Sequence, residues 1–154
     1  MKIDGRKHDH KTLEAIRKMA VRRIREGDFW YSVYTGRLNA ARFVEFLKDF
    51  MRYRRRPVFL VVDGLPAHKA KLVAAYVQFL RGKLELHFLP GYAPDLNPDE
   101  FVWNHLRHHG TTKTPLRKNE SLHRRVEENL AAIKNSPKLV SSFFHPKSVA
   151  YTMY

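Results

Sequence analysis

Residues 84–103, LELHFLPGYAPDLNPDEFVW, change from a strand pattern to a helix pattern within one short stretch of chain. Four apolar residues, Leu84, Leu86, Phe88 and Leu89, indicate a short strand, and the Pro-Gly pair that follows ends it. Asn97 is then a favourable N-cap, and Pro98 suits the first position of a helix because its missing N–H costs nothing there. Glu100 is the third residue of that predicted helix. The stretch therefore predicts a strand, a loop and a helix that presents a carboxylate in its first turn.

A second carboxylate follows another predicted strand. Residues 58–62, VFLVV, form the continuous apolar run that is typical of a strand buried on both faces, and Asp63 comes next. Open α/β sheets bind ligands at the carboxyl ends of their strands. Asp63 and Glu100 could converge on a hard cation such as Mg²⁺, and a pair of such ions assists phosphoryl transfer. The alternatives are a turn aspartate and one half of a capping box, each the commoner role when such a residue is taken singly.

Composition narrows the class of partner. The 154 residues are enough for one domain with a real core, and the formal net charge is +14, with a pI near 10.2. Nucleic acid is the first candidate partner, while an anionic membrane surface or a ribosome-type assembly would also fit. Cysteine is absent, which excludes disulfides, thiolate catalysis and Cys-ligated zinc. With no apolar run of about 18 residues and no signal-peptide core, we expect a cytoplasmic protein without a membrane partner.

The order of predicted elements indicates an α/β fold. A basic amphipathic helix is expected over residues 12–26, and it either lies on DNA or packs as an ordinary helix. Strands are then predicted at 29–35, 58–62 and 84–89, alternating with helices at 39–51, 67–80 and 97–109. Two more helices follow, one that begins at Asn119 or Ser121 and ends near Asn135, and one at 136–144. Alternation of strands and helices favours parallel pairing.

Two basic clusters and a histidine pair are further candidates for binding. The basic residues predicted to contact DNA phosphates are Arg52, Arg54, Arg55, Arg56, Lys113, Arg117 and Lys118. Solvated connections between elements are the alternative for these clusters. His105 and His109 lie one helical turn apart, but without a third ligand a polar surface is favoured over a metal site.

Residues 58–103 resemble the catalytic core of the DDE transposases, specifically the bacterial insertion-sequence branch of the mariner superfamily. The motifs are VVDG at 61–64 followed by His68, and LPGYAPDLNPDE at 89–100 followed by Trp103, which is similar to the family signature Y-[SA]-P-x-L-N-P-x-E-x-x-W. The resemblance implies an RNase H-like sheet flanked by helices, with three carboxylates that bind two Mg²⁺ or Mn²⁺ ions. It also implies that Asp63 is the second and Glu100 the third of these carboxylates.

The chain departs from the family pattern near its beginning. In the family the first catalytic Asp lies on a central strand, upstream of a β-meander whose third strand resembles residues 29–35. Only 28 residues precede that strand here, so we expect the central strand and its Asp to be missing. Residues 1–27 resemble the start of a helix-turn-helix region, and 28–154 the remaining part of the catalytic domain. The inner edge of the 58–62 strand should then be unpaired, and two-metal catalysis weakened.

The resemblance thus implies a transposase-type endonuclease and strand-transfer domain that acts on transposon ends and target DNA with Mg²⁺ or Mn²⁺, weakly or not at all. One alternative is a non-catalytic DNA-binding fragment that associates with a full-length transposase, or with its own copy, through the exposed sheet edge. Another is a decayed reading frame.

Overall fold

The computed structural model describes residues 21–23, 28–91, 93–111 and 115–149. Contacts divide the chain into two compact units. One unit is Leu38–Asn97, and the other joins Met1–Arg37 to Pro98–Tyr154.

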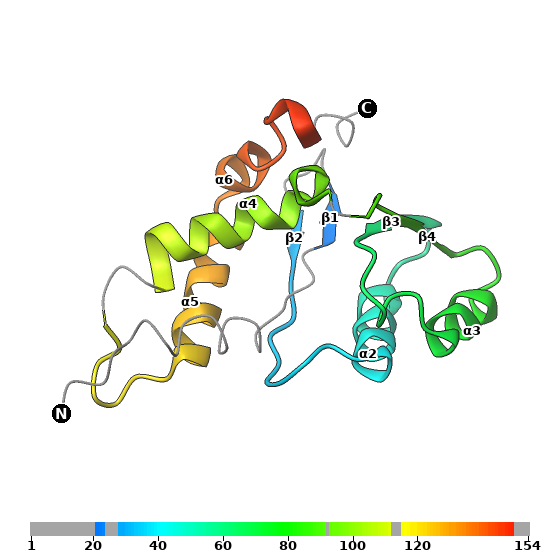
Figure 1. Ribbon diagram of the computed structural model, residues 1–154, viewed down its shortest axis with the longest axis horizontal. Helices are drawn as coiled ribbons and strands as arrows, with labels where there is room; N and C mark the ends of the chain where they lie inside the picture. Colours follow the sequence, from blue (N-terminus) through cyan, green and yellow to red (C-terminus); the bar gives the residue numbers. More distant parts are fainter. Residues whose placement is uncertain (1–20, 24–27, 92, 112–114, 150–154) are drawn as a thin grey trace. The chain divides into compact units, whose positions relative to one another are not determined.

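The Leu38–Asn97 unit is built on two parallel strands. β3 (Val58–Val62) pairs with β4 (Leu84–Phe88) in register from the first residue of each to the last. The helices α2 (Ala40–Met51) and α3 (Lys71–Phe79) lie on the same side of the two strands (Figure 1). The parallel pairing expected from the alternation of strands and helices is confirmed for this pair.

The helix α2 forms where the sequence predicts it. The Asn39 side chain accepts a hydrogen bond from the Arg42 backbone N–H at 2.9 Å, which caps the helix. Its buried stripe consists of Phe43, Val44, Phe46, Leu47, Phe50 and Met51. The next helix, α3, is shorter than the predicted span 67–80, and the chain leaves it through Gly82 at φ +81°, a conformation that favours glycine.

The faces of β3 differ from the prediction. Leu60 and Val62 are buried, whereas Phe59 is 69% exposed and Val61 44% exposed. The expectation of a strand buried on both faces is therefore wrong, because α2 and α3 cover only one side of the pair. Leu72 on α3 is also exposed.

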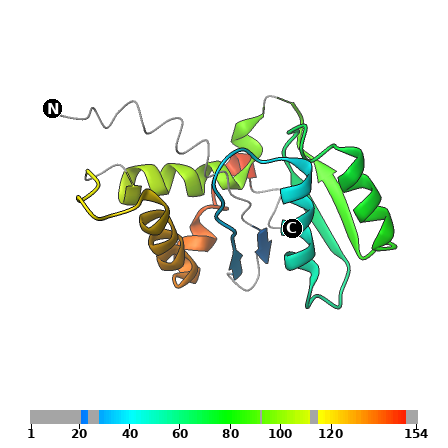
Figure 2. The same cartoon turned by 90° about the horizontal axis from the view of Figure 1, so that it is seen from below.

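The other unit is mainly helical. It contains α4 (Pro98–His105), which continues as the π-helix η2 (Leu106–Thr111), then α5 (Leu122–Lys134) and α6 (Pro137–Ser142). α5 packs against η2, the continuation of α4, as Figure 2 shows. Their common core consists of Phe29, Val102, Leu106, Val126, Leu130, Ile133, Val140, Phe143 and Phe144. Within the described ranges no helix is long and apolar enough to cross a membrane.

The first two strands differ from the predicted helix at 12–26 and from the predicted strand at 29–35. β1 (Val21–Arg23) pairs antiparallel with β2 (Asp28–Trp30). The helix expected over residues 12–26 is therefore wrong at 21–23, and the rest of that span lies outside the described residues. Four residues separate the two strands, and so short a connection joins antiparallel strands, not parallel ones. The strand expected at 29–35 is confirmed only at its beginning.

Candidate active site

Asp63 lies where the sequence predicts it, directly after β3. Its side chain is 40% exposed. The Oδ1 atom accepts a hydrogen bond from the Leu65 backbone N–H at 3.1 Å, and it lies 2.8 Å from Nδ1 of His68. A local turn of this type is common where Asp precedes Gly. In this chain the turn and the imidazole together hold the carboxylate at the end of the strand.

His68 is the residue that supports Asp63. Its Nδ1 also lies 3.2 Å from the Asp63 backbone oxygen, so a hydrogen on Nδ1 serves both contacts. The ring is 5% exposed and packs on Phe43 with 4.3 Å between ring centroids. Among the described residues no partner accompanies the buried Nε2 atom. His68 belongs to the VVDG motif segment, from which no role for it was predicted. Its position five residues after Asp63, beyond the end of a strand, is the signal in the sequence.

Glu100 is the third residue of α4, as predicted, and its side chain is half-buried. An acidic side chain in the first turn interacts favourably with the positive end of the helix dipole. The helix is held in place by Val102 and by Leu106 in the following π-helix turn, which are 4% and 1% exposed. Glu100 is therefore carried by an element with a packed base.

The two carboxylates belong to different units, Asp63 to Leu38–Asn97 and Glu100 to the other. Their convergence on one cation stays a prediction. In the part of the chain that the structure describes, no group of three or more His, Cys, Asp or Glu side chains could hold a metal ion. The oxygen donors and the hydrogen bonds that orient Asp63 fit a hard divalent cation, but two carboxylates supply only part of its ligands.

The basic residues after α2 differ in their surroundings. Arg52 is the C-cap of α2 and pairs with Asp49 at 2.6 Å. Arg54 donates from Nε to the Phe50 carbonyl at 3.0 Å, and its guanidinium lies 4.0 Å from the centroid of the Phe50 ring. Arg55 and Arg56 are exposed. A phosphate-contact role for these arginines stays a prediction.

The second basic cluster is only partly described. Arg117 and Lys118 are exposed, whereas Lys113 lies outside the described residues.

His105 and His109 have ring centroids 4.7 Å apart. Burial and the neighbouring His109 lower the pKa of His105 from its ordinary value. No third ligand accompanies this pair within the described ranges.

Residues 7–123 match the model of the DDE superfamily endonuclease family, and the chain belongs to that family. Its fold is similar to the catalytic domain of the Mos1 mariner transposase, with a TM-score of 0.63 and 18% identity over 95% of this chain and 86% of that one. The Mos1 catalytic domain with raltegravir and Mn gives a TM-score of 0.62 and 19% identity over 95% and 87% of the two chains. A Mos1 transposase paired-end complex with the left transposon end gives 0.62 and 22% identity, over 82% of this chain and 40% of that chain.

A comparison with curated protein sequences gave no significant match. The structural similarities confirm the α/β, RNase H-like fold class predicted from the sequence. At identities of 18% and 19% these similarities establish the fold alone.

Proposed function

We propose that this chain is a metal-dependent DNA endonuclease and strand-transfer domain of the mariner type, acting on the DNA ends of a bacterial insertion sequence and on target DNA. The observation that carries the proposal is Asp63, a partly exposed carboxylate held by His68 and by a backbone N–H at the end of a parallel strand, in a member of the DDE endonuclease family. The insertion-sequence branch rests on the motif at residues 92–103. A cytoplasmic location stays a prediction from the sequence.

We propose Mg²⁺ or Mn²⁺ as the cofactor, with Asp63 and Glu100 as its ligands. Structures of the Mos1 catalytic domain with Mn and with Mg are consistent with a divalent ion in relatives of this fold. When bound, the ion would polarise a phosphodiester and lower the pKa of an attacking water. In this proposal the protein holds the carboxylate oxygens of Asp63 and Glu100 in position. His68 orients the Asp63 carboxylate, and the core beneath α4 fixes Glu100.

The proposed DNA contacts are electrostatic. The described members are Arg52, Arg54, Arg55, Arg56, Arg117 and Lys118, and Lys113 is proposed from the sequence alone. Phosphate contacts of this kind give affinity without base specificity, and their strength falls as salt rises. The Mos1 complex with a transposon end supports DNA as the class of partner.

Reduced activity is part of the same proposal. The division into a helix-turn-helix remnant at 1–27 and a catalytic part at 28–154 stays a prediction, and residues 21–23 depart from it because they form a strand. In this division the first catalytic Asp is missing. Two carboxylates would then bind one ion more weakly than three bind two. We therefore expect slow nicking and little strand transfer.

A second candidate function is a non-catalytic DNA-binding fragment that pairs with a full-length transposase. Two observations favour it. The side chains of Phe59 and Val61 on β3 are exposed, and β4 is the only strand among those described that is hydrogen-bonded to β3. An uncharged strand with one open edge can accept a further strand. Light scattering of the chain alone and mixed with the transposase distinguishes a self-associated dimer from the mixed complex.

The test is nicking of supercoiled plasmid with Mn²⁺, compared between the parent chain, Asp63→Asn and Glu100→Gln. The proposal expects nicking that requires the metal and is lost in both variants. Asp95→Asn is the matched control, because Asp95 is an exposed carboxylate in the same stretch as Glu100. Nicking that persists in both variants would exclude the assignment. DNA binding without any nicking in the parent would favour the second candidate.

A further inference from the structure

The connector at residues 115–120 is fastened to α5 by a buried arginine. The Arg125 side chain is only 10% exposed, whereas most arginines in the described range 37–124 are at the surface. Its Nε donates to Oε1 of Glu120 at 2.6 Å, and its Nη2 donates to Oε2 of the same carboxylate. This two-point pairing fixes both the distance and the plane of the two groups.

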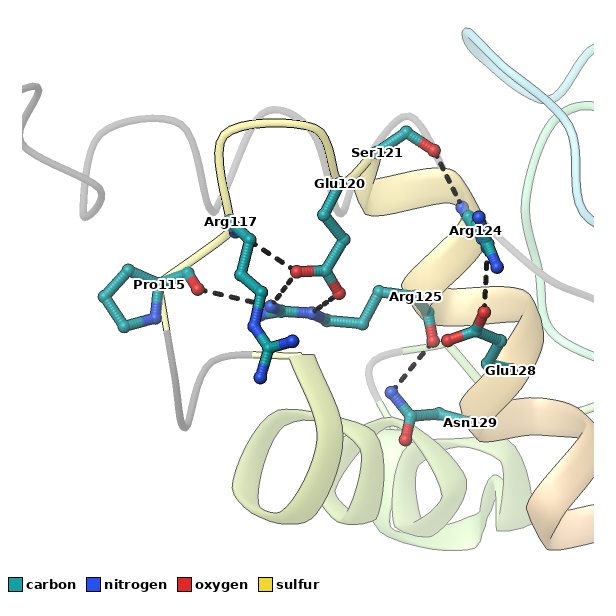
Figure 3. A network of polar contacts seen from close by, with 8 residues as sticks. All are labelled: Pro115, Arg117, Glu120, Ser121, Arg124, Arg125, Glu128 and Asn129. Carbon is teal, nitrogen blue, oxygen red and sulfur yellow. Dashed lines mark hydrogen bonds and ion pairs between the residues drawn. The ribbon is translucent and has the colours of Figure 1, made fainter.

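The same two side chains hold the backbone of the connector (Figure 3). Nη2 of Arg125 also donates to the Pro115 carbonyl at 3.2 Å. The Arg117 backbone N–H donates to Oε2 of Glu120 at 3.1 Å, and the Glu120 backbone N–H donates to the Arg117 carbonyl at 3.0 Å. The beginning, middle and end of the connector are therefore all tied to one ion pair, which we call the clamp.

The helix beneath the clamp is itself well anchored. Ser121 caps α5 by accepting a hydrogen bond from the Arg124 backbone N–H at 3.2 Å. Asn129 donates to the Arg125 carbonyl at 2.9 Å one turn further on. Val126, next to Arg125, is fully buried in the core. The clamp thus ties the connector to a rigid element.

The clamp leaves two cations facing solvent at the middle of the connector. Arg117 and Lys118 are exposed, and the Arg117 side chain extends away from the Glu120 carboxylate in Figure 3. Hydrogen bonds from Arg125 and from the Arg117 backbone lower the pKa of Glu120 to about 2, so Glu120 is ionised at neutral pH. Its charge is matched by Arg125, which takes both carboxylate oxygens.

We propose that Glu120 and Arg125 are positioning residues, which hold the connector ready to bind the phosphate backbone of duplex DNA through Arg117 and Lys118. The inference rests on the proposed function, in which these two residues contact DNA. A loop that is ordered before binding loses less conformational entropy when it binds, and its affinity is higher for that reason. A carboxylate would then strengthen the binding of a polyanion, although its charge alone opposes it.

This opposition of signs makes the inference testable. Glu120→Gln raises the formal net charge of +14 by one unit, so charge alone predicts tighter DNA binding. The clamp predicts the opposite. Glu128→Gln is the matched control, because Glu128 makes an exposed ion pair with Arg124 on the same helix, with Nε and Oε1 2.9 Å apart, and its substitution changes the charge equally.

The experiment measures the affinity of the full chain for a random-sequence duplex by fluorescence anisotropy at several salt concentrations. We expect Glu120→Gln to bind about tenfold more weakly than Glu128→Gln. We also expect the slope of log affinity against log salt concentration to become shallower in Glu120→Gln, by an amount equivalent to the loss of up to about two phosphate contacts. Arg125→Lys keeps the net charge but loses the two-point pairing, and it should weaken binding in the same way.

Two controls separate positioning from unfolding. Circular dichroism and the melting temperature report whether a variant is folded. If Glu120→Gln does not fold, the affinity of Arg125→Lys is compared with that of Glu128→Gln instead. In a chain in which Arg117 and Lys118 are both alanine, Glu120→Gln should no longer weaken binding. If folded Glu120→Gln and Glu128→Gln bind DNA with equal affinity, the proposed positioning role of the clamp is refuted, while the proposed DNA binding is not. Absence of DNA binding in the parent at low salt would instead overturn the proposed function.

Discussion

Replacing Leu130 with alanine tests the core that carries α4 and, with it, Glu100. Leu130 is fully buried on α5 and packs in the same cluster as Val102 and Leu106. The substitution removes three carbon groups, each worth about 0.8 kcal/mol of transfer free energy, or about 2.4 kcal/mol together. The cavity that remains adds to this loss, and comparable buried leucines give about 2.7–5 kcal/mol in total. For a domain with a stability of about 5–15 kcal/mol the effect is large.

The assay is urea unfolding followed by circular dichroism, with the free energy of unfolding compared between the parent and the variant. Leu116→Ala is the matched control, because Leu116 is 45% exposed and its loss should stay within about 0.5 kcal/mol. A Leu130→Ala variant no less stable than Leu116→Ala would refute the packing of α5 in this core. Glu100 would then have no rigid base.

Three further predictions concern single sites. His68→Ala should weaken Mn²⁺ binding about tenfold in a titration, because Asp63 loses its imidazole partner, whereas the exposed His87→Ala should leave it unchanged. Gly110→Ala should lower the free energy of unfolding by about 1 kcal/mol, because an added Cβ would lie 2.6 Å from the Asn129 side-chain nitrogen, and that side chain must turn away and lose its hydrogen bond to the Arg125 carbonyl. An equally stable variant in thermal melts would contradict this contact. The lowered pKa of His105 means that the unfolded chain binds more protons, so stability should fall as pH drops below about 6.5, and His105→Gln should flatten that part of a pH series of urea midpoints.

The sequence predicted those elements whose signals are local. Asn39 caps a helix that begins where its side chain indicates, and Ser121, one of two candidates together with Asn119, caps α5. The apolar run at 58–62 and the segment at 84–88 are strands. Both candidate carboxylates lie at the ends of elements, as the Gly and Pro residues around them indicate. These features depend on a few neighbouring residues, and long-range packing does not override them.

Features that depend on packing were harder to predict. The run VFLVV at 58–62 is equally apolar on both faces of the strand, so its pattern does not reveal that only one face is covered. Residues 21–23 fall inside the span 12–26 that was predicted as a helix, but pairing with residues 28–30 decides their conformation. The role of His68 follows from the turn that brings its ring back to Asp63, and the role of Arg125 from a carboxylate five residues earlier. Neither contact has a periodic pattern in the sequence.

The most direct test of the central claim is a double-mutant cycle on Mn²⁺ affinity, measured by electron paramagnetic resonance with the parent, Asp63→Asn, Glu100→Gln and the double variant. If both carboxylates bind the same ion, each single substitution weakens binding by about tenfold or more, and the double variant is weakened by less than the two effects combined. The exposed Asp95→Asn should bind as the parent does. Strictly additive effects, or a single substitution with no effect, would contradict a shared metal site.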